Sequence, residues 1–422
     1  MISRYLGNKN VILDEILEAV GERAEPGDLV CDVFSGSLSV SYGLKRSGYR
    51  VAANDVNLFS SVLGRAFILN DQIPPVPVAD LLGSKGDRLR KAATSGLSSY
   101  EGREGYAYLD DPRYREAAAD LLALLLYLDE SPGNEGLDPE FARTDFFDHY
   151  CEEGGKSAFT SSRGREGRRR FFSSANARHI DGILNRVRQW RSEGLLEPPL
   201  EAMILSIALR AIERVSNTQG TYHDFPRDRY DPRALRPLRL ELPPLDGLLE
   251  TGVEHLIGTE SDSLEFISEV PEHPVLYLDP PYNFRQYTAY YFLPNVICRY
   301  PTLDDPEEYF SGLRYVRGQN PDDDFVSSFC KPRQFLPSLR TLIERAKTQT
   351  VVLSYFDGRN HWNDFKAEAN AGGIDRLEEF FEDDLFVPGS LQIRPVSRQN
   401  YQSYGGFKAR NVSEYLFIAA KA

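Results

Sequence analysis

The pattern of apolar and polar positions near the N-terminus predicts the first half of an open α/β sheet. Apolar residues recur at helical spacing over 11–20, and residues 29–34 form a short apolar strand. A turn containing serine and glycine follows, then a helix over 38–46 and a second strand over 49–53. Strand, glycine turn, helix and strand in this order are typical of a doubly wound parallel sheet.

Strand-like alternation stops after residue 72 and returns near residue 254. The intervening segment reads mostly as helix and loop, and further strands are predicted at 254–257, 275–278, 350–355 and 414–420. A chain of 422 residues exceeds the usual length of one domain. We therefore expect an α/β, Rossmann-like domain formed by 1–72 and 254–422, interrupted by a large, mostly helical insertion over 73–253.

Composition narrows the class of protein without deciding it. No apolar run has the length that spans a membrane, and no signal-peptide pattern opens the sequence. The four cysteines are far apart, with neither metal-ligand nor disulfide spacing. We therefore expect a cytoplasmic enzyme with reduced thiols and no bound metal.

The formal net charge of −14 is unfavourable for a nucleic-acid partner, which needs a positive surface. The distribution of charge changes this picture, because arginines gather at 163–170 and again at 227–239 within the insertion. Arginine suits bidentate contacts to phosphate and guanine. Each cluster alone is explained equally well by arginine-rich composition and solvated faces. The pair favours a nucleic-acid surface that includes Arg168, Arg169, Arg170, Arg227 and Arg229.

The strongest chemical signal is the tetrapeptide Asp279-Pro280-Pro281-Tyr282, which directly follows the predicted strand at 275–278. Prolines end a strand, so the acid and the ring stand at its carboxyl end, where open α/β sheets bind ligands. The Asp279 carboxylate and the Pro280 carbonyl can accept hydrogen bonds from a nucleobase amine and free its lone pair, while Tyr282 stacks on the extruded base. The alternative is a strand-terminating turn with a buried tyrosine.

A second motif, Asp32-Val33-Phe34-Ser35-Gly36, ends the first strand. Glycine there lets the backbone approach a ligand, and Asp55 at the end of the second strand is placed to accept hydrogen bonds from an adenosyl ribose. Leu38 stands where a dinucleotide fingerprint has glycine, which disfavours a nicotinamide cofactor. A structural turn and a surface acid would also explain this pattern.

Three further segments carry polar or aromatic groups. Residues 4–9 hold Tyr5 and Lys9, which could reach a cofactor carboxylate, although a capping turn explains the segment as well. Arg285 and Tyr287 belong to an aromatic- and arginine-rich segment that suits base stacking or an amphipathic core. The polar loop containing Asn217 and Thr218 could contact phosphate or a base edge, or could simply end a helix.

Together these segments resemble the Dam-type, alpha-group DNA adenine-N6 methyltransferases. The resemblance lies at 4–9, 32–36, 54–55, 217–220 and 279–291, and in their order: cofactor motif, recognition insertion, catalytic tetrapeptide. The segment over 73–170 matches no family pattern that we can name.

This resemblance implies a Rossmann-like domain that binds S-adenosylmethionine. Carried over by motif, Tyr5 and Lys9 would touch the methionine end of the cofactor, and Phe34 and Gly36 would line it. Asp55 would bind its ribose, and Asp262 would face its adenine. The catalytic positions fall on Asp279, Pro280 and Tyr282. The family commonly has a second glycine where Leu38 stands, which bears on cofactor affinity.

The function expected is therefore methyl transfer to adenine N6 at a specific site in duplex DNA, with base flipping. We expect a prokaryotic enzyme of a restriction-modification or phage-defence system, for which a cognate nuclease is a possible partner, or an orphan enzyme. When it acts on DNA, we expect it to be associated with the nucleoid. An enzyme acting on RNA bases or on cytosine N4 is the nearest alternative. A DNA-binding module that has lost catalysis is another, favoured by Leu38.

Overall fold

The computed structural model describes residues 5–218, 220–356, 361–362, 372–399 and 411–422, and divides into two compact units. The sheet unit comprises Gly7–Gly64, Thr251–Tyr287 and Phe325–Ala422. The helical unit comprises Met1–Leu6, Arg65–Glu250 and Thr288–Asp324. Most of the predicted insertion thus falls in the helical unit, which also takes in a later segment. That each unit acts as a functional domain stays a prediction.

A seven-stranded sheet in the order β5-β2-β1-β6-β7-β9-β8 forms the centre of the sheet unit. Strand β9 runs antiparallel to both neighbours, and the other paired strands are parallel. The predicted α/β class with a mostly parallel sheet is therefore confirmed. The strands are β1 (Leu29–Asp32), β2 (Arg50–Ala53), β5 (Leu256–Ile257), β6 (His273–Leu278), β7 (Thr348–Phe356), β8 (Gln392–Gln399) and β9 (Asn411–Ala420).

The strand order reverses direction at β1, which places a topological switch point between β1 and β6. In the register of the sheet, Asp32 at the end of β1 lies between Ala53 of β2 and Tyr277 of β6. The loops that follow these three parallel strands therefore leave the same edge of the sheet. Ligands bind at this edge and at such a switch point in open α/β sheets.

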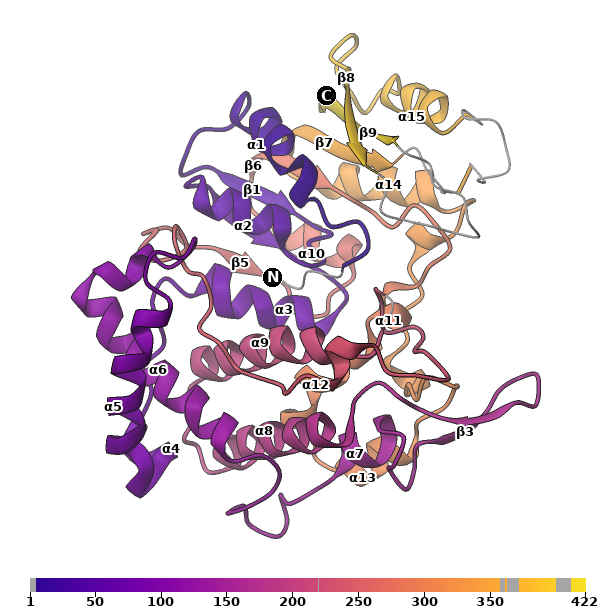
Figure 1. Ribbon diagram of the computed structural model, residues 1–422. Coiled ribbons are helices and arrows are strands. Elements are labelled where there is room, and N and C mark those ends of the chain that lie inside the picture. Colours follow the sequence, from indigo (N-terminus) through magenta and orange to yellow (C-terminus); the bar gives the residue numbers. More distant parts are fainter. Residues whose placement is uncertain (1–4, 219, 357–360, 363–371, 400–410) are drawn as a thin grey trace. The chain divides into compact units, whose positions relative to one another are not determined.

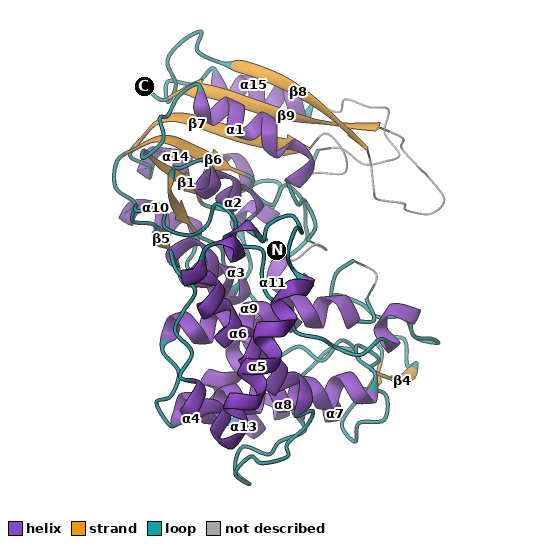
Figure 2. Ribbon diagram, turned by 60° about the vertical axis from the view of Figure 1, so that its left-hand side comes forward, coloured by secondary structure: helices purple, strands orange, loops and turns teal. Residues whose placement is uncertain are grey.

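Helices cover both faces of this sheet (Figure 2). On one face, α10, α14 and α15 pack their apolar residues against the strands in a single buried cluster. On the other, α2 packs against β1, β2 and α1. The helical segments of this unit are η1 (Asn10–Ile12), α1 (Leu13–Gly21), α2 (Ser39–Arg46), α3 (Leu58–Gly64), α10 (Ser263–Glu269), η9 (Ser328–Cys330), α14 (Phe335–Arg345) and α15 (Gly373–Phe381).

The helical unit is dominated by three long helices, α6 (Pro112–Glu130), α8 (Ser174–Ser192) and α9 (Pro198–Val215) (Figure 1). Helices α6 and α9 each begin with proline, whose missing N–H costs nothing in a first turn. Within the described ranges, no helix combines the length and apolar character needed to cross a bilayer.

The remaining elements of this unit are short. They are η2 (Arg65–Leu69), α4 (Val78–Leu82), η3 (Gly83–Lys85), α5 (Gly86–Gly96), η4 (Leu97–Ser99), η5 (Ala107–Asp110), α7 (Asp145–Tyr150), β3 (Ala158–Thr160), β4 (Glu166–Arg168), η6 (Pro232–Leu235), α12 (Phe292–Arg299), η7 (Tyr300–Thr302), α13 (Pro306–Ser311) and η8 (Pro321–Asp323), with α11 (Tyr287–Tyr290) at the boundary.

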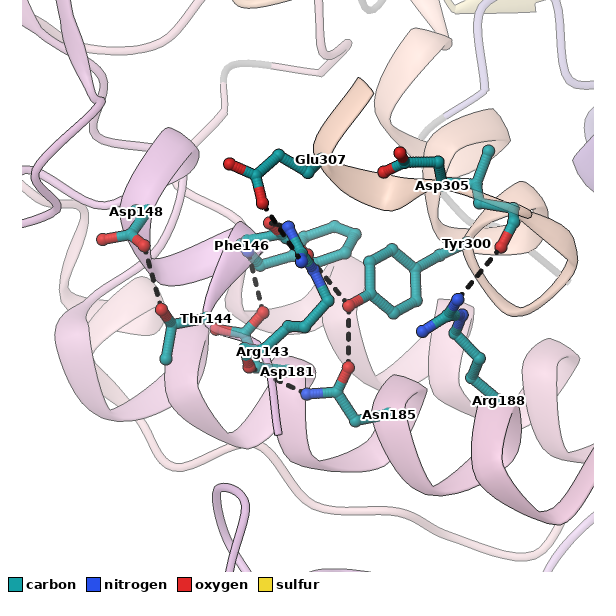
Figure 3. A network of polar contacts seen from close by, with 12 residues as sticks. Arg143, Thr144, Phe146, Asp148, Asp181, Asn185, Arg188, Tyr300, Asp305 and Glu307 are labelled. Carbon is teal, nitrogen blue, oxygen red and sulfur yellow. Dashed lines mark hydrogen bonds and ion pairs between the residues drawn. The ribbon is translucent and has the colours of Figure 1, made fainter. Parts of the chain in front are cut away.

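A buried polar network joins α7, α8 and η7 inside the helical unit (Figure 3). Asp181 of α8 accepts hydrogen bonds from the backbone N–H groups of Phe146 and Phe147 at 2.8 and 3.0 Å, and so caps the start of α7. The Tyr300 hydroxyl lies 3.0 Å from the Asp145 carboxylate and 2.7 Å from the Asn185 side-chain oxygen. This network explains why the late segment containing Tyr300 belongs to the helical unit.

Candidate functional site

Asp279 stands just beyond the carboxyl end of β6, at the edge of the sheet where the switch point lies. Its carboxylate oxygen Oδ1 is 2.9 Å from the Lys9 ammonium. Pro280 is buried directly after it. The predicted catalytic acid is therefore fixed at the ligand-binding edge by a positive charge from a segment far away in the sequence.

Lys9 is 3% exposed and also forms an ion pair with Glu414 on β9. Burial alone would lower the pKa of the Lys9 ammonium, but attraction to Asp279 and Glu414 outweighs it and raises that pKa. Glu414 in turn accepts a hydrogen bond from the Ser354 hydroxyl at 2.8 Å. Sequence reasoning missed Glu414, although a charged residue opening an otherwise apolar strand was the available signal.

Asp32, the last residue of β1, is a second acid of this edge that the sequence reasoning did not select. Burial raises its pKa to about 7, the Ser41 hydroxyl donates to it at 2.6 Å and lowers the pKa, and Asp279 raises it further. Its Oδ1 atom is buried and has no hydrogen-bond partner among the described residues. An unpartnered buried carboxylate oxygen, with the charges of Asp279 and Asp55 acting on it, suits a positively charged ligand.

The glycine turn after β1 is held by the acid after β2. Gly36 has a φ of 49° and its N–H donates to Asp55 Oδ2 at 3.0 Å. Asp55 also accepts from the backbone and side chain of Asn57, at 2.9 and 2.8 Å. Burial raises the pKa of the Asp55 carboxyl, and these hydrogen bonds oppose the rise. The structure thus brings Gly36 and Asp55 together, and contact with a ribose stays a prediction.

Leu38 adopts the backbone conformation that glycine takes most easily. Its φ is 64°, in the left-handed region, and its side chain is 1% exposed. Leu38 can therefore form the turn at a position where the resembled family has glycine, because burial of the leucine side chain offsets the free-energy cost of the left-handed backbone. Phe34, within the same turn, is half-buried with its ring edge-on to Phe329 at a centroid distance of 5.0 Å.

Asp262 caps a helix in the sheet unit. Its carboxylate accepts from the Leu264 N–H at 2.8 Å, which fixes the start of α10. The Asn54 side chain donates to the Ser261 carbonyl at 2.9 Å and holds the preceding loop beside the end of β2. Asp262 therefore has a structural role at this edge, and its contact with a cofactor adenine stays a prediction.

The two aromatic residues predicted to stack on a base, Tyr282 and Tyr287, are at least partly buried. Tyr282 is 8% exposed and packs against Tyr355 and Phe356, with ring centroids at 5.8 and 6.4 Å. Burial raises the pKa of the Tyr287 hydroxyl, and the charge of Asp279 raises it further. Stacking of Tyr282 or Tyr287 on a base stays a prediction.

Two other predicted site residues have defined contacts. The Arg285 N–H donates to the Asn283 side chain at 3.0 Å, and its carbonyl accepts from the Cys330 thiol at 3.1 Å. Tyr5, in the helical unit, stacks on Tyr291 at a centroid distance of 4.6 Å. Arg4 of the first motif and Gln219 of the polar loop lie outside the described residues.

The three consecutive arginines at 168–170 form hydrogen bonds and ion pairs within the helical unit. Arg169 is 6% exposed and its guanidinium donates to backbone carbonyls, including that of Val316 at 3.0 Å. Arg168 donates to the Glu152 and Gly154 carbonyls at 2.9 and 2.8 Å, and Arg170 pairs with the Glu152 carboxylate. Arg169 consequently has the least access to a phosphate of the three.

The β3–β4 hairpin extends away from the helices of its own unit (Figure 1). Arg163 and Arg165 are exposed at its tip, and among the described residues no ion pair or side-chain hydrogen bond occupies either guanidinium. Arg227 lies beside the hairpin, with its guanidinium 5.1 Å from the centre of the Phe159 ring. Positive charge is therefore presented at the tip, while arginines at the base anchor the hairpin.

The polar loop predicted to contact DNA is buried. Asn217 donates to the Arg170 and Arg229 carbonyls at 2.9 and 3.2 Å and accepts from the Asp231 N–H at 2.9 Å. The Thr218 carbonyl accepts from Arg233 at 2.7 Å. These contacts tie the loop carrying Arg229 to the hairpin base, and direct contact of Asn217 or Thr218 with DNA stays a prediction.

Comparison with known proteins finds a family that is similar to the N-terminal part of this chain. Residues 5–173 match the family described as D12 class N6 adenine-specific DNA methyltransferases. The matched range includes Lys9, the glycine turn, Asp55 and the β3–β4 hairpin. The predicted resemblance to adenine-N6 methyltransferases is thereby confirmed.

Several curated relatives extend the likeness along the chain. It is 26% identical to the type II methyltransferase M.FokI of Planomicrobium okeanokoites, over 99% of this chain and 52% of that protein. It is 27% identical to the type II methyltransferase M.NlaIII of Neisseria lactamica, over 99% of both. It is 25% identical to the modification methylase StsI of Streptococcus sanguinis, over 98% of this chain and 51% of that protein. The chain thus spans about half the length of M.FokI and StsI.

Proposed function

Because residues 5–173 match the D12 class of N6 adenine-specific DNA methyltransferases, we propose that this chain methylates adenine N6 at a specific site in duplex DNA. The observation that carries the proposal is the position of Asp279, at the carboxyl end of β6, paired with Lys9 at 2.9 Å. An acid at that place meets the requirement for chemistry on an exocyclic amine.

The protein's part in the reaction is to hold and activate the amine. The adenine amine is a poor nucleophile because its lone pair is delocalised into the ring. Hydrogen bonds from it to the Asp279 carboxylate and the Pro280 carbonyl favour a tetrahedral nitrogen and localise the lone pair. The nearby Lys9 charge favours the ionised form of Asp279, which is the form that accepts these hydrogen bonds. Proximity and in-line orientation then supply much of the rate.

The methyl donor proposed is S-adenosylmethionine, whose sulfonium supplies an activated methyl group when it is bound. Several groups at the sheet edge suit it. The unpartnered Oδ1 of Asp32 and the surrounding acids favour its positive charge, and Gly36 leaves room for close approach. Asp55 and Asp262, after β2 and β5, are proposed to contact the ribose and the adenine. Tyr5, Lys9 and Phe34 are proposed to complete the cofactor site.

Duplex DNA is the proposed substrate, and the helical unit is proposed to recognise it. The exposed hairpin tip with Arg163 and Arg165 supports this, because a two-stranded ribbon fits the major groove and arginine suits phosphate and guanine. The target base must leave the stack to reach Asp279, so base flipping belongs to the proposal. Arg168, Arg170, Arg227, Arg229, Arg285 and Tyr287 are proposed as further contacts.

A restriction-modification setting is proposed from the names of the relatives, which are type II methyltransferases and a modification methylase. In that setting the enzyme acts on the DNA of its own prokaryotic cell and protects its recognition sites from a cognate nuclease. The nuclease is the partner to be sought.

The test is expression in a host that lacks DNA methylation, followed by digestion of its DNA to nucleosides. N6-methyladenine is expected with the wild type and absent with Asp279→Asn, which loses the carboxylate but keeps the size of the side chain. Asp375→Asn, at an exposed position of the same unit, is the matched control and should keep activity.

Each other result would contradict the proposal in a different way. N4-methylcytosine would assign the enzyme to the other amine. Modified nucleosides found in RNA alone would assign it to RNA. No modified nucleoside, together with no measurable affinity for S-adenosylmethionine, would indicate a DNA-binding module. Normal activity of Asp279→Asn would remove Asp279 from the mechanism.

A further inference from the structure

Tyr315 combines an unfavourable backbone with an exposed side chain. Its φ is 59°, and among the described residues only Leu38, Glu250 and Glu260 are other non-glycine residues with positive φ. A left-handed backbone is costly for a bulky residue, and glycine would adopt it freely. Leu38 recovers this cost by burial, whereas Tyr315 is 51% exposed and does not. The strain at Tyr315 is therefore not explained by packing.

The loop carrying Tyr315 is a closed turn. Arg314 and Gln319 exchange two backbone hydrogen bonds, at 2.7 and 3.0 Å, and the Gly318 N–H donates to the Tyr315 carbonyl at 3.1 Å. These bonds fix the chain on both sides of the tyrosine. The ring is consequently presented from a defined backbone position.

Buried side chains of the helical unit donate hydrogen bonds to the backbone carbonyls of this turn. Arg169 donates to the Val316 carbonyl at 3.0 Å and to the Tyr315 carbonyl at 3.4 Å. The buried Tyr150 hydroxyl donates to the Gly318 carbonyl at 2.8 Å. Any Cβ at Gly318 would come within 2.7 Å of the Arg169 side chain, so the two fit closely. The same arginine that anchors the hairpin base thus also supports the Tyr315 turn.

One face of the Tyr315 ring carries a fixed cation. The Arg317 guanidinium lies 4.7 Å from the ring centre, and its Nε donates to the Gln319 side chain at 2.6 Å. Gln319 is fully buried and donates in turn to Asp324. The arrangement is a rigid, exposed aromatic ring backed by an arginine, which keeps the ring from folding onto the protein surface.

We propose that Tyr315 stacks on a nucleobase of the bound DNA, with Arg317 on the opposite side of its ring. The inference rests on the proposed function. Every base offers a π-face, and an aromatic ring already held in place loses little entropy on stacking. The Arg317 charge adds attraction to the phosphates beside the stacked base. A tyrosine serving this role justifies strain that glycine would remove.

The experiment measures initial rates of methyl transfer from S-adenosylmethionine to unmethylated genomic DNA at increasing DNA concentration. Tyr315→Ala in the full chain is expected to lower kcat/KM for DNA by about 5- to 150-fold, the range for loss of one base–aromatic stack. Tyr315→Phe keeps the ring and should remain close to wild type. Leu235→Ala is the matched control, because Leu235 is also in the helical unit and is 60% exposed.

Tyr315→Gly separates stacking from a structural role. It removes the ring and relieves the left-handed strain, so kcat/KM for DNA should fall while the thermal midpoint stays equal or rises. The inference is overturned if Tyr315→Ala methylates DNA like wild type, or if Tyr315→Gly lowers the midpoint and spares kcat/KM. It is also overturned if Leu235→Ala loses as much kcat/KM as Tyr315→Ala. A wild-type enzyme with no activity on DNA would instead refute the proposed function.

Discussion

The Lys9 ammonium lies 2.9 Å from the Asp279 carboxylate, and this pair joins the first motif of the chain to the tetrapeptide after β6. Glu414, on β9, pairs with the same ammonium. One buried cation therefore stabilises two carboxylates, and the positions of Asp279 and of β9 depend on it. Lys9 therefore has a role within the protein in addition to the contact with the cofactor that is proposed for it.

Replacement of Lys9 by methionine should destabilise the fold as well as reduce activity. Removal of one partner of a buried ion pair leaves uncompensated charge and costs about 3–5 kcal/mol. We expect a loss of this size in urea denaturation, together with loss of methyl transfer. Lys91→Met, at an exposed position, is the control. If Lys9→Met instead raises only the KM for S-adenosylmethionine and keeps stability, Lys9 serves the cofactor and not Asp279.

Asp32 should make the stability of the protein depend on pH in a defined window. Its pKa is raised from 3.8 to about 7, by burial first, so the folded state holds a proton that the unfolded state releases. The stability that Asp32 contributes is therefore fully present below its unfolded pKa of 3.8, and it is lost as the pH rises through its folded pKa of about 7.

The Asn variant isolates this effect, because Asp32→Asn keeps an acceptor for Ser41 and cannot ionise. As the pH rises from below 3.8 to above about 7, the free energy of unfolding of Asp32→Asn should increase by up to about 4 kcal/mol relative to that of wild type. Urea denaturation at both ends measures the difference. Parallel pH dependence of the two proteins would mean that the pKa of Asp32 is the same in the folded and unfolded states.

At position 38 the glycine variant should be more stable than the alanine variant, which reverses the order usual at buried positions. Both Leu38→Ala and Leu38→Gly lose a buried side chain, at about 2–5 kcal/mol. Glycine adopts the left-handed backbone without the cost of about 1–2 kcal/mol that alanine bears, so the glycine variant should be the more stable of the two. Thermal or urea unfolding gives the order directly. An alanine variant more stable than the glycine variant would show that the turn has a different conformation in solution.

Local sequence patterns predicted the features of the structure that depend on residues near one another in the chain. Apolar runs predicted six of the seven strands of the sheet but not β8, and the prolines that end β6 predicted the place of Asp279. The pairing of Lys9 with Glu414 spans 405 positions, and no local pattern encodes a contact at that separation. The arginine cluster showed charge but not exposure, so Arg169 was selected although it is buried. Burial depends on partners such as Val316, which join the helical unit only in three dimensions.

Arginines at the hairpin tip and at its base should differ in their effect on the salt dependence of DNA affinity. Each phosphate contact contributes about 0.9 to the slope of log affinity against log salt, so Arg163→Gln with Arg165→Gln should reduce the slope by about 2. Stability should be unchanged, because both side chains are exposed. Arg169→Gln should do the reverse: it loses hydrogen bonds to carbonyls and lowers stability, with little change in slope. Fluorescence anisotropy with a labelled duplex measures the slopes. Equal slopes for wild type and the tip variant would exclude the hairpin tip from phosphate contact and move recognition to another surface of the helical unit.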